Sequence, residues 1–232
     1  MTETQRPEPE LGTAPPPWWS PLVAAVAEAS GPEVPRVASD TALLYSPEDA
    51  RSASVLVLLS DRAEPGRETG RPSVLLQQRA SGLRHHPGEV AFPGGAADPG
   101  DAGPVDTALR EAAEELAVDP GTVAIGPSLP PLWIPVSGFA VTPVLALWTE
   151  PHPVTPDGDE VAAAHQVPLS SLADPAARGS VRYPSGGTGP GFRVPGVPLI
   201  WGFTAGVLSW LLDLGGWSRP WNTGRTMELE GF

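Results

Sequence analysis

Residues 104–118 (PVDTALREAAEELAV) restrict the fold of this chain more than any other segment. On a helix with 3.6 residues per turn, the apolar side chains gather on one side: Leu109, Ala112, Ala113 and Leu116. That side is narrow and rich in alanine, so the helix can lie close against a sheet. The acidic side chains gather on the opposite side: Glu111, Glu114 and Glu115. We therefore expect a helix that packs on a sheet and presents three neighbouring carboxylates.

The three glutamates repel one another, and their presence needs an explanation. Like charges at helical spacing cost roughly 0.2–0.5 kcal/mol per pair, and the C-terminal half of a helix favours cations by roughly 0.3–1 kcal/mol each. Arg110 offsets part of this cost, but a single arginine cannot neutralise three carboxylates. A divalent cation such as Mg²⁺ or Mn²⁺ can, because both take hard oxygen ligands. The alternative is a solvated acidic face, which is the common meaning of a charge run.

The segment before the helix favours a binding site over a solvated face. Residues 89–95 (EVAFPGG) predict a short strand that ends in two glycines. Gly94 and Gly95 would allow positive φ and close backbone approach, and a backbone carbonyl there could join a metal. Asp98 and Asp101 add further oxygen ligands or a helix cap.

The remaining secondary structure predicts an α+β fold with a mixed sheet. Strands are expected at 52–61, 73–79, 122–129, 139–148, 160–169, 180–185 and 192–202, with a Gly-rich loop between the last two. The first two of these strands should form a hairpin. A short helical turn should follow 160–169, and a final helix should begin near Phe203. Strands and helices do not alternate regularly, which argues against a parallel βαβ sheet.

The chain divides into four expected parts. Residues 1–17 are predicted to be a disordered arm, 18–50 a helical extension, 51–218 the main domain and 219–232 a tail. The extension should contain a short helix within 16–31, with Ser20 as its N-cap and Pro21 as its first residue. Trp18 and Trp19 are expected to pack it onto the domain.

Composition excludes several classes of function. There is no cysteine, so disulfides and thiolate metal sites are excluded and a cytoplasmic location is expected. Fourteen Lys and Arg against 27 Asp and Glu give a net charge of −13, which disfavours nucleic-acid and anionic-membrane binding. We expect neither a signal peptide nor a membrane helix. The oligomeric state is left open, with a homodimer as one option.

The acidic helix and the glycines before it resemble the Nudix box. The matching residues are Gly95, Arg110, Glu111, Ala112, Glu114, Glu115 and Val118. Asp101 stands where the box has a glutamate, with one extra residue before Arg110, and Ala117 stands where it has glycine. The resemblance implies an α/β/α sandwich around a central mixed sheet. It also implies an Mg²⁺- or Mn²⁺-dependent hydrolase acting on nucleoside diphosphates linked to another moiety.

The region before the box is similar to that of coenzyme A pyrophosphatases within this superfamily. In residues 75–95 the matching positions are Arg79, Leu83, Arg84, Gly88, Phe92, Pro93, Gly94 and Gly95. Residues 199–208 (LIWGFTAGVL) resemble a C-terminal segment of the same subfamily. This resemblance implies cleavage of coenzyme A or its thioesters to 3′,5′-ADP and 4′-phosphopantetheine or its acyl form.

The resemblance also implies roles for single residues. Glu111, Glu114 and Glu115 would bind the metal, and Arg110 would orient them through a bidentate bond. The substrate-binding candidates are Arg79, Arg84, Gly94 and Gly95. Two further arginines, Arg182 and Arg193, could close over the substrate. The general base is left open between Glu115 and Glu160.

Several alternatives are left open, for single residues and for the whole protein. Either histidine of the pair His85 and His86 could contact phosphate, whereas a zinc site is disfavoured because adjacent residues of an extended segment point to opposite sides. Trp201 is more readily explained by packing than by substrate contact. At the level of the whole protein, the substrate could instead be ADP-ribose or a dinucleoside polyphosphate, or the domain could be a binding module without catalysis.

Overall fold

The computed structural model describes residues 14–29, 49–61, 72–135, 137–183 and 186–229. The predicted disordered arm therefore lies mostly outside the described residues. The helices are α1 (Trp19–Ala29), α2 (Pro104–Leu116), the short 3₁₀ helix η2 (Pro120–Thr122), α3 (Leu169–Leu172) and α4 (Gly202–Leu214). The strands of the larger sheet are β1 (Arg51–Ser60), β2 (Ser73–Arg79), β3 (Val90–Ala91), β4 (Gly94–Ala96), β5 (Val123–Ser128), β6 (Leu132–Ile134), β7 (Phe139–Trp148) and β8 (Val161–Pro168). No helix in the described part of the chain is long and apolar enough to span a membrane.

The central sheet is mixed, as the sequence predicts. Its main path is β3-β2-β1-β7-β5, while β4 pairs with β1, β6 with β7 and β8 with β2. The strands β1 and β7 run parallel from the Arg51–Phe139 pair to the Leu59–Leu147 pair, and the other pairs of this sheet are antiparallel. The expected β1–β2 pair forms, with Leu59 opposite Val74.

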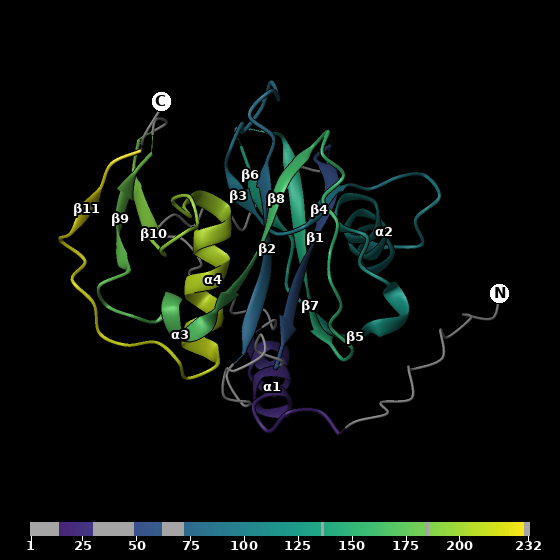
Figure 1. The fold of residues 1–232 in the computed structure, drawn as a ribbon, viewed down its shortest axis with the longest axis horizontal. Coiled ribbons are helices and arrows are strands. Elements are labelled where there is room, and N and C mark those ends of the chain that lie inside the picture. Colours follow the sequence, from purple (N-terminus) through teal and green to yellow (C-terminus); the bar gives the residue numbers. More distant parts are fainter. Residues whose placement is uncertain (1–13, 30–48, 62–71, 136, 184–185, 230–232) are drawn as a thin grey trace.

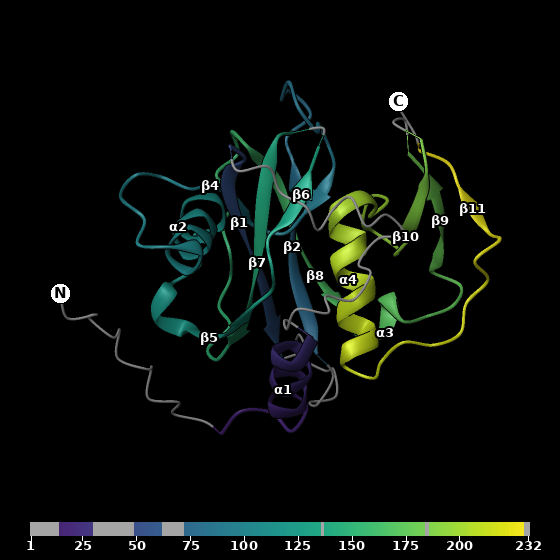
Figure 2. The same cartoon turned by 180° about the vertical axis from the view of Figure 1, so that it is seen from behind.

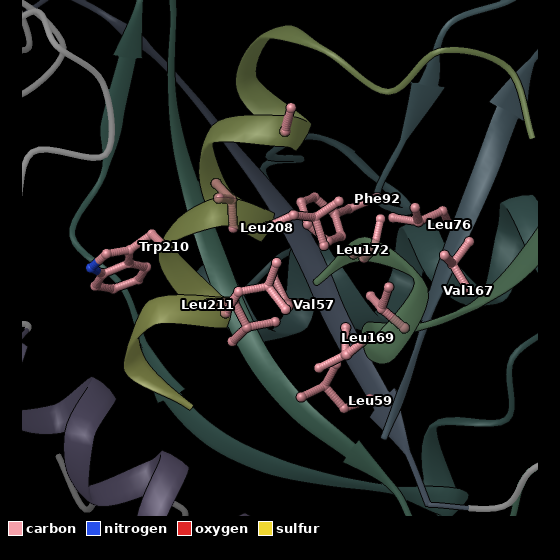
Figure 3. Packing of buried hydrophobic residues seen from close by; sticks show 14 of the residues in the cluster. Val57, Leu59, Leu76, Phe92, Val167, Leu169, Leu172, Leu208, Trp210 and Leu211 are labelled. Carbon is pink, nitrogen blue, oxygen red and sulfur yellow. The ribbon is translucent and has the colours of Figure 1, made fainter. Parts of the chain in front are cut away.

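Helices cover both faces of this sheet and make a three-layer sandwich (Figures 1 and 2). Side chains alternate between faces along a strand, so β1 contributes Val57 and Leu59 to one core and Leu56 and Leu58 to the other. The first core also contains residues of α1, α3 and α4, and the second contains the apolar side of α2. Figure 3 shows the first core, where Val57 of β1 lies beside Leu211 of α4. The expected α+β sandwich is confirmed.

A second, three-stranded sheet lies beyond α4 in both views (Figures 1 and 2). Its order is β10 (Thr188–Phe192), β9 (Arg178–Arg182) and β11 (Thr226–Met227). The prediction of a Gly-rich loop followed by a strand over 192–202 is therefore wrong in part. Residues 188–192 form the strand, and beyond it Ile200 makes only an isolated bridge to Phe192. Glycine is needed there for close packing: a Cβ at Gly191 would lie 2.4 Å from Cγ2 of Val181. The predicted tail also contributes, since it supplies β11.

The N-terminal extension packs onto the domain through its tryptophans, as expected. Trp19 is buried in the first core, and Nε1 of Trp18 donates a hydrogen bond to Oδ1 of Asp61 at 2.8 Å. Trp18 also meets Trp217 edge to face. The helix itself begins at Trp19, two residues before the expected first residue Pro21. Its expected end at Gly31 lies outside the described residues.

Candidate active site

The helix α2 begins and ends close to the predicted positions. It starts at Pro104 directly after Gly103, and it ends at Leu116. Ala117 follows with φ 56° and ψ 35°, in the left-handed region that favours glycine. Its N–H donates to the Ala113 carbonyl at 3.0 Å and closes the last turn. Ala117 therefore takes a strained conformation in the position where the box has glycine.

The prediction that Glu115 lies with the other two glutamates on the side of α2 opposite its apolar residues is wrong. Glu115 is only 5% exposed, whereas the Glu114 side chain is 60% exposed. Glu115 follows the fully buried Ala108 by seven residues, which is two helical turns, so the two share the side that faces the sheet. The buried side of α2 is thus rotated toward Glu115 and away from Ala113, which is half-buried.

Two hydrogen bonds hold the buried carboxylate of Glu115. Nε2 of Gln77 on β2 donates to Oε1 at 2.7 Å, and the backbone N–H of Gly94 donates to Oε2 at 2.8 Å. Burial raises the pKa of Glu115 to about 7, although both hydrogen bonds and the nearby Arg79 favour its ionised form. The site thus keeps a desolvated carboxylate between a strand, a glycine turn and a helix.

Arg110 connects the glycine loop to the other two glutamates. Its Nε and Nη2 donate to the two oxygens of Asp101, each at 3.0 Å. Its Nη1 donates to Glu111 at 2.9 Å and to Glu114 at 3.1 Å. Arg110 therefore contacts the glutamates as predicted, but its bidentate partner is Asp101. These hydrogen bonds hold the pKa of Asp101 well below its usual range.

The lack of a side chain at Gly95 leaves room for the carboxylate of Glu111. A Cβ at Gly95 would lie 2.5 Å from the carboxyl carbon of Glu111, which is closer than two carbon atoms can approach. Gly94 shows positive φ, and a Cβ there would meet the Ser54 carbonyl oxygen at 2.3 Å. Both glycines thus permit close approach, and the expected positive φ occurs at Gly94. Burial raises the pKa of Glu111, Arg110 opposes this shift, and Glu114 and Glu160 add to it.

Glu160 lies in the neighbourhood of the site, because its charge raises the pKa of Glu111. Glu160 is exposed and lies in the turn before β8. One oxygen of Asp157 accepts hydrogen bonds from the backbone N–H groups of Asp159, Glu160 and Val161. The Glu160 carbonyl accepts from Ala80 N–H at 2.8 Å. The backbone at Glu160 is therefore fixed between this turn and the residue that follows β2.

The loop after β2 closes on Arg79. The Arg79 N–H donates to the Glu89 carbonyl at 2.9 Å, and the Gly88 N–H donates to the Arg79 carbonyl at 3.2 Å. Nε of Arg79 is buried and has no hydrogen-bond partner among the described residues. Arg84 lies exposed in the same loop. His86 contacts both oxygens of Glu89 at 3.0 Å.

The structure brings most of the predicted site together. Arg79, Gly94, Gly95, Arg110 and the three glutamates are linked by contacts or by their electrostatic effects on one another. Arg182 and Arg193 lie in or beside the smaller sheet, on the far side of α4 from α2 (Figures 1 and 2). Trp201 lies beside Tyr183, with ring centroids 6.0 Å apart, which agrees with a packing role.

The site offers oxygen ligands of the kind that a hard divalent cation prefers, but its carboxylates lie apart from one another. Among the described residues, no three histidine, aspartate or glutamate side chains gather closely enough to hold a metal ion. Arg110 bonds one oxygen of Glu111 and one of Glu114, so the second oxygen of each carboxylate can serve as a metal ligand. Next to Glu115, Oε1 of Gln77 is buried and has no hydrogen-bond partner among the described residues. These oxygens fit the ligand preferences of Mg²⁺ and Mn²⁺.

Sequence reasoning missed two residues of this site. Gln77 is fully buried, but in the sequence it stands beside the polar Gln78 and Arg79, so nothing there marked it as part of the site. Asp157 precedes Gly158, which has positive φ, so the turn could have been recognised from its Asp-Gly pair.

Comparison with known proteins agrees with this geometry. Residues 50–184 match the model of the NUDIX domain. The chain is 46% identical over 120 residues to "Uncharacterized Nudix hydrolase NudL" of Cronobacter sakazakii, covering 52% of this chain and 58% of that protein. The protein of the same name from Pectobacterium atrosepticum is 50% identical over 98 residues, covering 42% of this chain and 50% of that one. The match thus spans 50–58% of the length of these curated relatives.

One solved structure shares the fold over most of its length. The crystal structure of a Nudix hydrolase from M. smegmatis, RenU, superposes with a TM-score of 0.51 at 22% identity, covering 75% of this chain and 90% of that one. At this identity the likeness concerns the fold alone.

Proposed function

Because this chain belongs to the Nudix family, we propose that it is a metal-dependent pyrophosphohydrolase that cleaves the diphosphate of coenzyme A or its thioesters. The products would be 3′,5′-ADP and 4′-phosphopantetheine or its acyl form. The family supports a hydrolase of diphosphate bonds, and the sequence of residues 75–95 supports the choice of coenzyme A.

One observation carries this proposal: the segment 75–95 bonds Glu115 near both of its ends. Nε2 of Gln77 donates to one oxygen of the Glu115 carboxylate and the Gly94 N–H donates to the other, while the charge of Arg79 lowers the pKa of that carboxylate. The segment that resembles the coenzyme A subfamily and the helix that carries the box therefore belong to one site.

Glu111, Glu114 and Glu115 would hold the cation, with Mg²⁺ and Mn²⁺ as the candidates. When bound, such a cation neutralises the charge that develops on phosphoryl oxygens during attack by water. The protein itself supplies position: Arg110 holds Glu111 and Glu114 on one side, while Gly94 and Gln77 hold Glu115 on the other. Fixed donors and fixed charges are the main means by which proteins accelerate phosphoryl transfer.

Glu160 is the better candidate for the general base. Both oxygens of Glu115 already accept hydrogen bonds, and that carboxylate is buried. Glu160 is exposed, and its backbone is fixed by Asp157. It also lies close enough to Glu111 to raise the pKa of that carboxyl group. A base must reach the water that attacks, so an accessible carboxylate suits this role better.

Two arginines are candidates for the phosphate groups of the substrate. Nε of Arg79 is buried without a partner among the described residues, next to the carboxylates, and a diphosphate oxygen could satisfy it. Arg84 is exposed in the loop that closes on Arg79, where it could reach the diphosphate or the 3′-phosphate. These positive charges would offset the net charge of −13 that repels an anionic substrate.

A substrate panel tests the specificity. We expect kcat/KM in the presence of Mn²⁺ to be highest for coenzyme A or an acyl-coenzyme A, compared with ADP-ribose and a dinucleoside polyphosphate. Turnover of ADP-ribose with coenzyme A left intact would overturn the choice of substrate while leaving a Nudix hydrolase in place.

A single substitution separates an enzyme from a binding module. We expect Glu114→Gln to reduce kcat by at least about 100-fold with an unchanged circular dichroism spectrum, because it removes one charged ligand. Glu28→Gln is a matched control, since Glu28 is an exposed glutamate on α1. Equal activity of Glu114→Gln and the wild type would remove Glu114 from the catalytic site.

A further inference from the structure

Gln77 is a polar side chain in the buried part of β2. It is fully buried, and it points to the α2 side of the sheet together with Leu75, two residues earlier on the same strand. Its Nε2 donates to Glu115, whereas its Oε1 is buried and accepts no hydrogen bond within the described residues. A buried amide oxygen without a partner is unfavourable compared with an apolar side chain, so core packing alone does not account for glutamine here.

We infer that Gln77 is a positioning residue for Glu115 and sets how tightly the site holds a divalent cation. This inference rests on the proposed function, because it requires Glu115 to be a cation ligand. Gln77 holds one carboxylate oxygen and the Gly94 N–H holds the other, so the plane of the carboxylate is fixed. Outer hydrogen bonds of this kind typically raise metal affinity or activity roughly 10- to 100-fold.

The orientation of the amide follows from its partner. A carboxylate that binds a cation is ionised and only accepts hydrogen bonds, so the NH₂ group of Gln77 faces Glu115 in that form. The oxygen, attached to the same carbon atom, then lies in the immediate neighbourhood of that carboxylate. Side-chain amide oxygens are among the ligands that hard divalent cations take. Gln77 therefore adds a neutral oxygen next to Glu115 as well as the hydrogen bond that orients it.

A purely structural role would give a different pattern of effects. If Gln77 only tied β2 to α2, its loss would lower stability and leave the affinity for cations unchanged in the folded protein. If it positions Glu115, its loss would weaken cation binding and reduce kcat, with little change in KM for the substrate.

Mn²⁺ binding to the metal-free, full-length protein tests the inference without any substrate. We expect Gln77→Met, which keeps the length of the side chain and removes both polar groups, to weaken Mn²⁺ binding roughly 10- to 100-fold by calorimetry. Gln166→Met is the matched control, because Nε2 of Gln166 donates to Ser60 at the opposite end of β1 from the glycine turn. We expect that control to bind Mn²⁺ like the wild type. If Gln77→Met does not fold, Gln77→Asn retains the amide but is too short to reach Glu115, and the same loss is expected.

The double variant shows whether Gln77 acts through Glu115. In the Glu115→Gln background, we expect Gln77→Met to cause no further loss of Mn²⁺ affinity. Two outcomes would overturn the inference about Gln77 and leave the proposed metal site in place. One is an equal loss of Mn²⁺ affinity from Gln77→Met in the wild-type and Glu115→Gln backgrounds. The other is wild-type Mn²⁺ affinity in Gln77→Met when Glu115→Gln binds Mn²⁺ more weakly. Wild-type Mn²⁺ affinity in Glu115→Gln would instead overturn the proposed metal site itself.

Discussion

Asp101 and Arg110 form a fork in which Nε and Nη2 of the arginine donate to the two carboxylate oxygens, each at 3.0 Å. The remaining terminal nitrogen, Nη1, then reaches Glu111 and Glu114. Asp101 thus sets the direction of Arg110, and Arg110 sets the positions of two candidate ligands. The aspartate that departs from the family pattern in the sequence has a definite role in the structure.

Arg110→Lys should reduce activity although it conserves the charge. An ammonium group is a single point and cannot make the fork to Asp101 while also bonding two glutamates. We expect kcat to fall roughly 10- to 100-fold, as for other residues that orient ligands. Arg225→Lys is the control, since Arg225 lies beside the smaller sheet and bonds the Ala176 carbonyl. Steady-state kinetics on both variants decide this, and equal kcat values would contradict the role given to Arg110.

Gly95→Ala should displace Glu111. The new Cβ would lie 2.5 Å from the carboxyl carbon of Glu111, so the glutamate or the turn must move. A displacement of about 1 Å at a catalytic site can reduce the rate by roughly 100-fold. Gly100→Ala in the following loop is the matched control, because a Cβ there meets nothing within 4 Å. Retained activity in Gly95→Ala would show that Glu111 is not needed where it lies.

Ala117→Gly should stabilise the protein. Ala117 occupies the left-handed region with φ 56°, which costs an alanine roughly 1–2 kcal/mol. We expect a gain of about 0.5–1 kcal/mol in the free energy of unfolding by urea, after allowing for the greater entropy of glycine in the unfolded chain. Ala24→Gly, in the interior and on the exposed side of α1, should instead lose about 1 kcal/mol. The same sign for both substitutions would contradict the conformation given to Ala117.

His165 should make stability fall in mild acid. Burial lowers the pKa of this half-buried histidine below its usual value of 6.5, and its Nε2 has no hydrogen-bond partner among the described residues. Below pH 6.5 the unfolded chain therefore binds a proton that the folded protein resists, so the free energy of unfolding decreases as pH falls. We expect the wild type to lose more stability than His165→Leu between pH 7.5 and pH 5.5 in urea unfolding. Parallel losses in the two proteins would show that His165 does not contribute.

The elements that carry the fold could be predicted because their patterns are local. Residues 52–61 and 73–79 each contain a short apolar run between polar residues, and the structure places strands there within one residue. The α2 helix shows a clear division between apolar and acidic positions, and its start at Pro104 was readable from the sequence. A glycine-rich strand such as β10 shows no apolar run, because close packing against Val181 and Met227 leaves no room for a side chain at Gly191.

The sequence could predict most of the residues that form the site, but not which of them are buried. Which side of α2 is buried depends on where the sheet lies, so the sequence could not show that Glu115 faces inward while Glu114 stays exposed. Gln77 and Glu115 are 38 residues apart, and only the packed structure brings them together. The same holds for Glu160, which reaches the neighbourhood of Glu111 through the turn that Asp157 fixes.

The most direct test is mass analysis of the products that form when Mn²⁺ is added to the metal-free protein with coenzyme A. We expect no reaction before the addition, followed by equal amounts of two products with the masses of 3′,5′-ADP and 4′-phosphopantetheine. Intact coenzyme A after prolonged incubation, or the same products at the same rate in the absence of any divalent cation, would contradict the account.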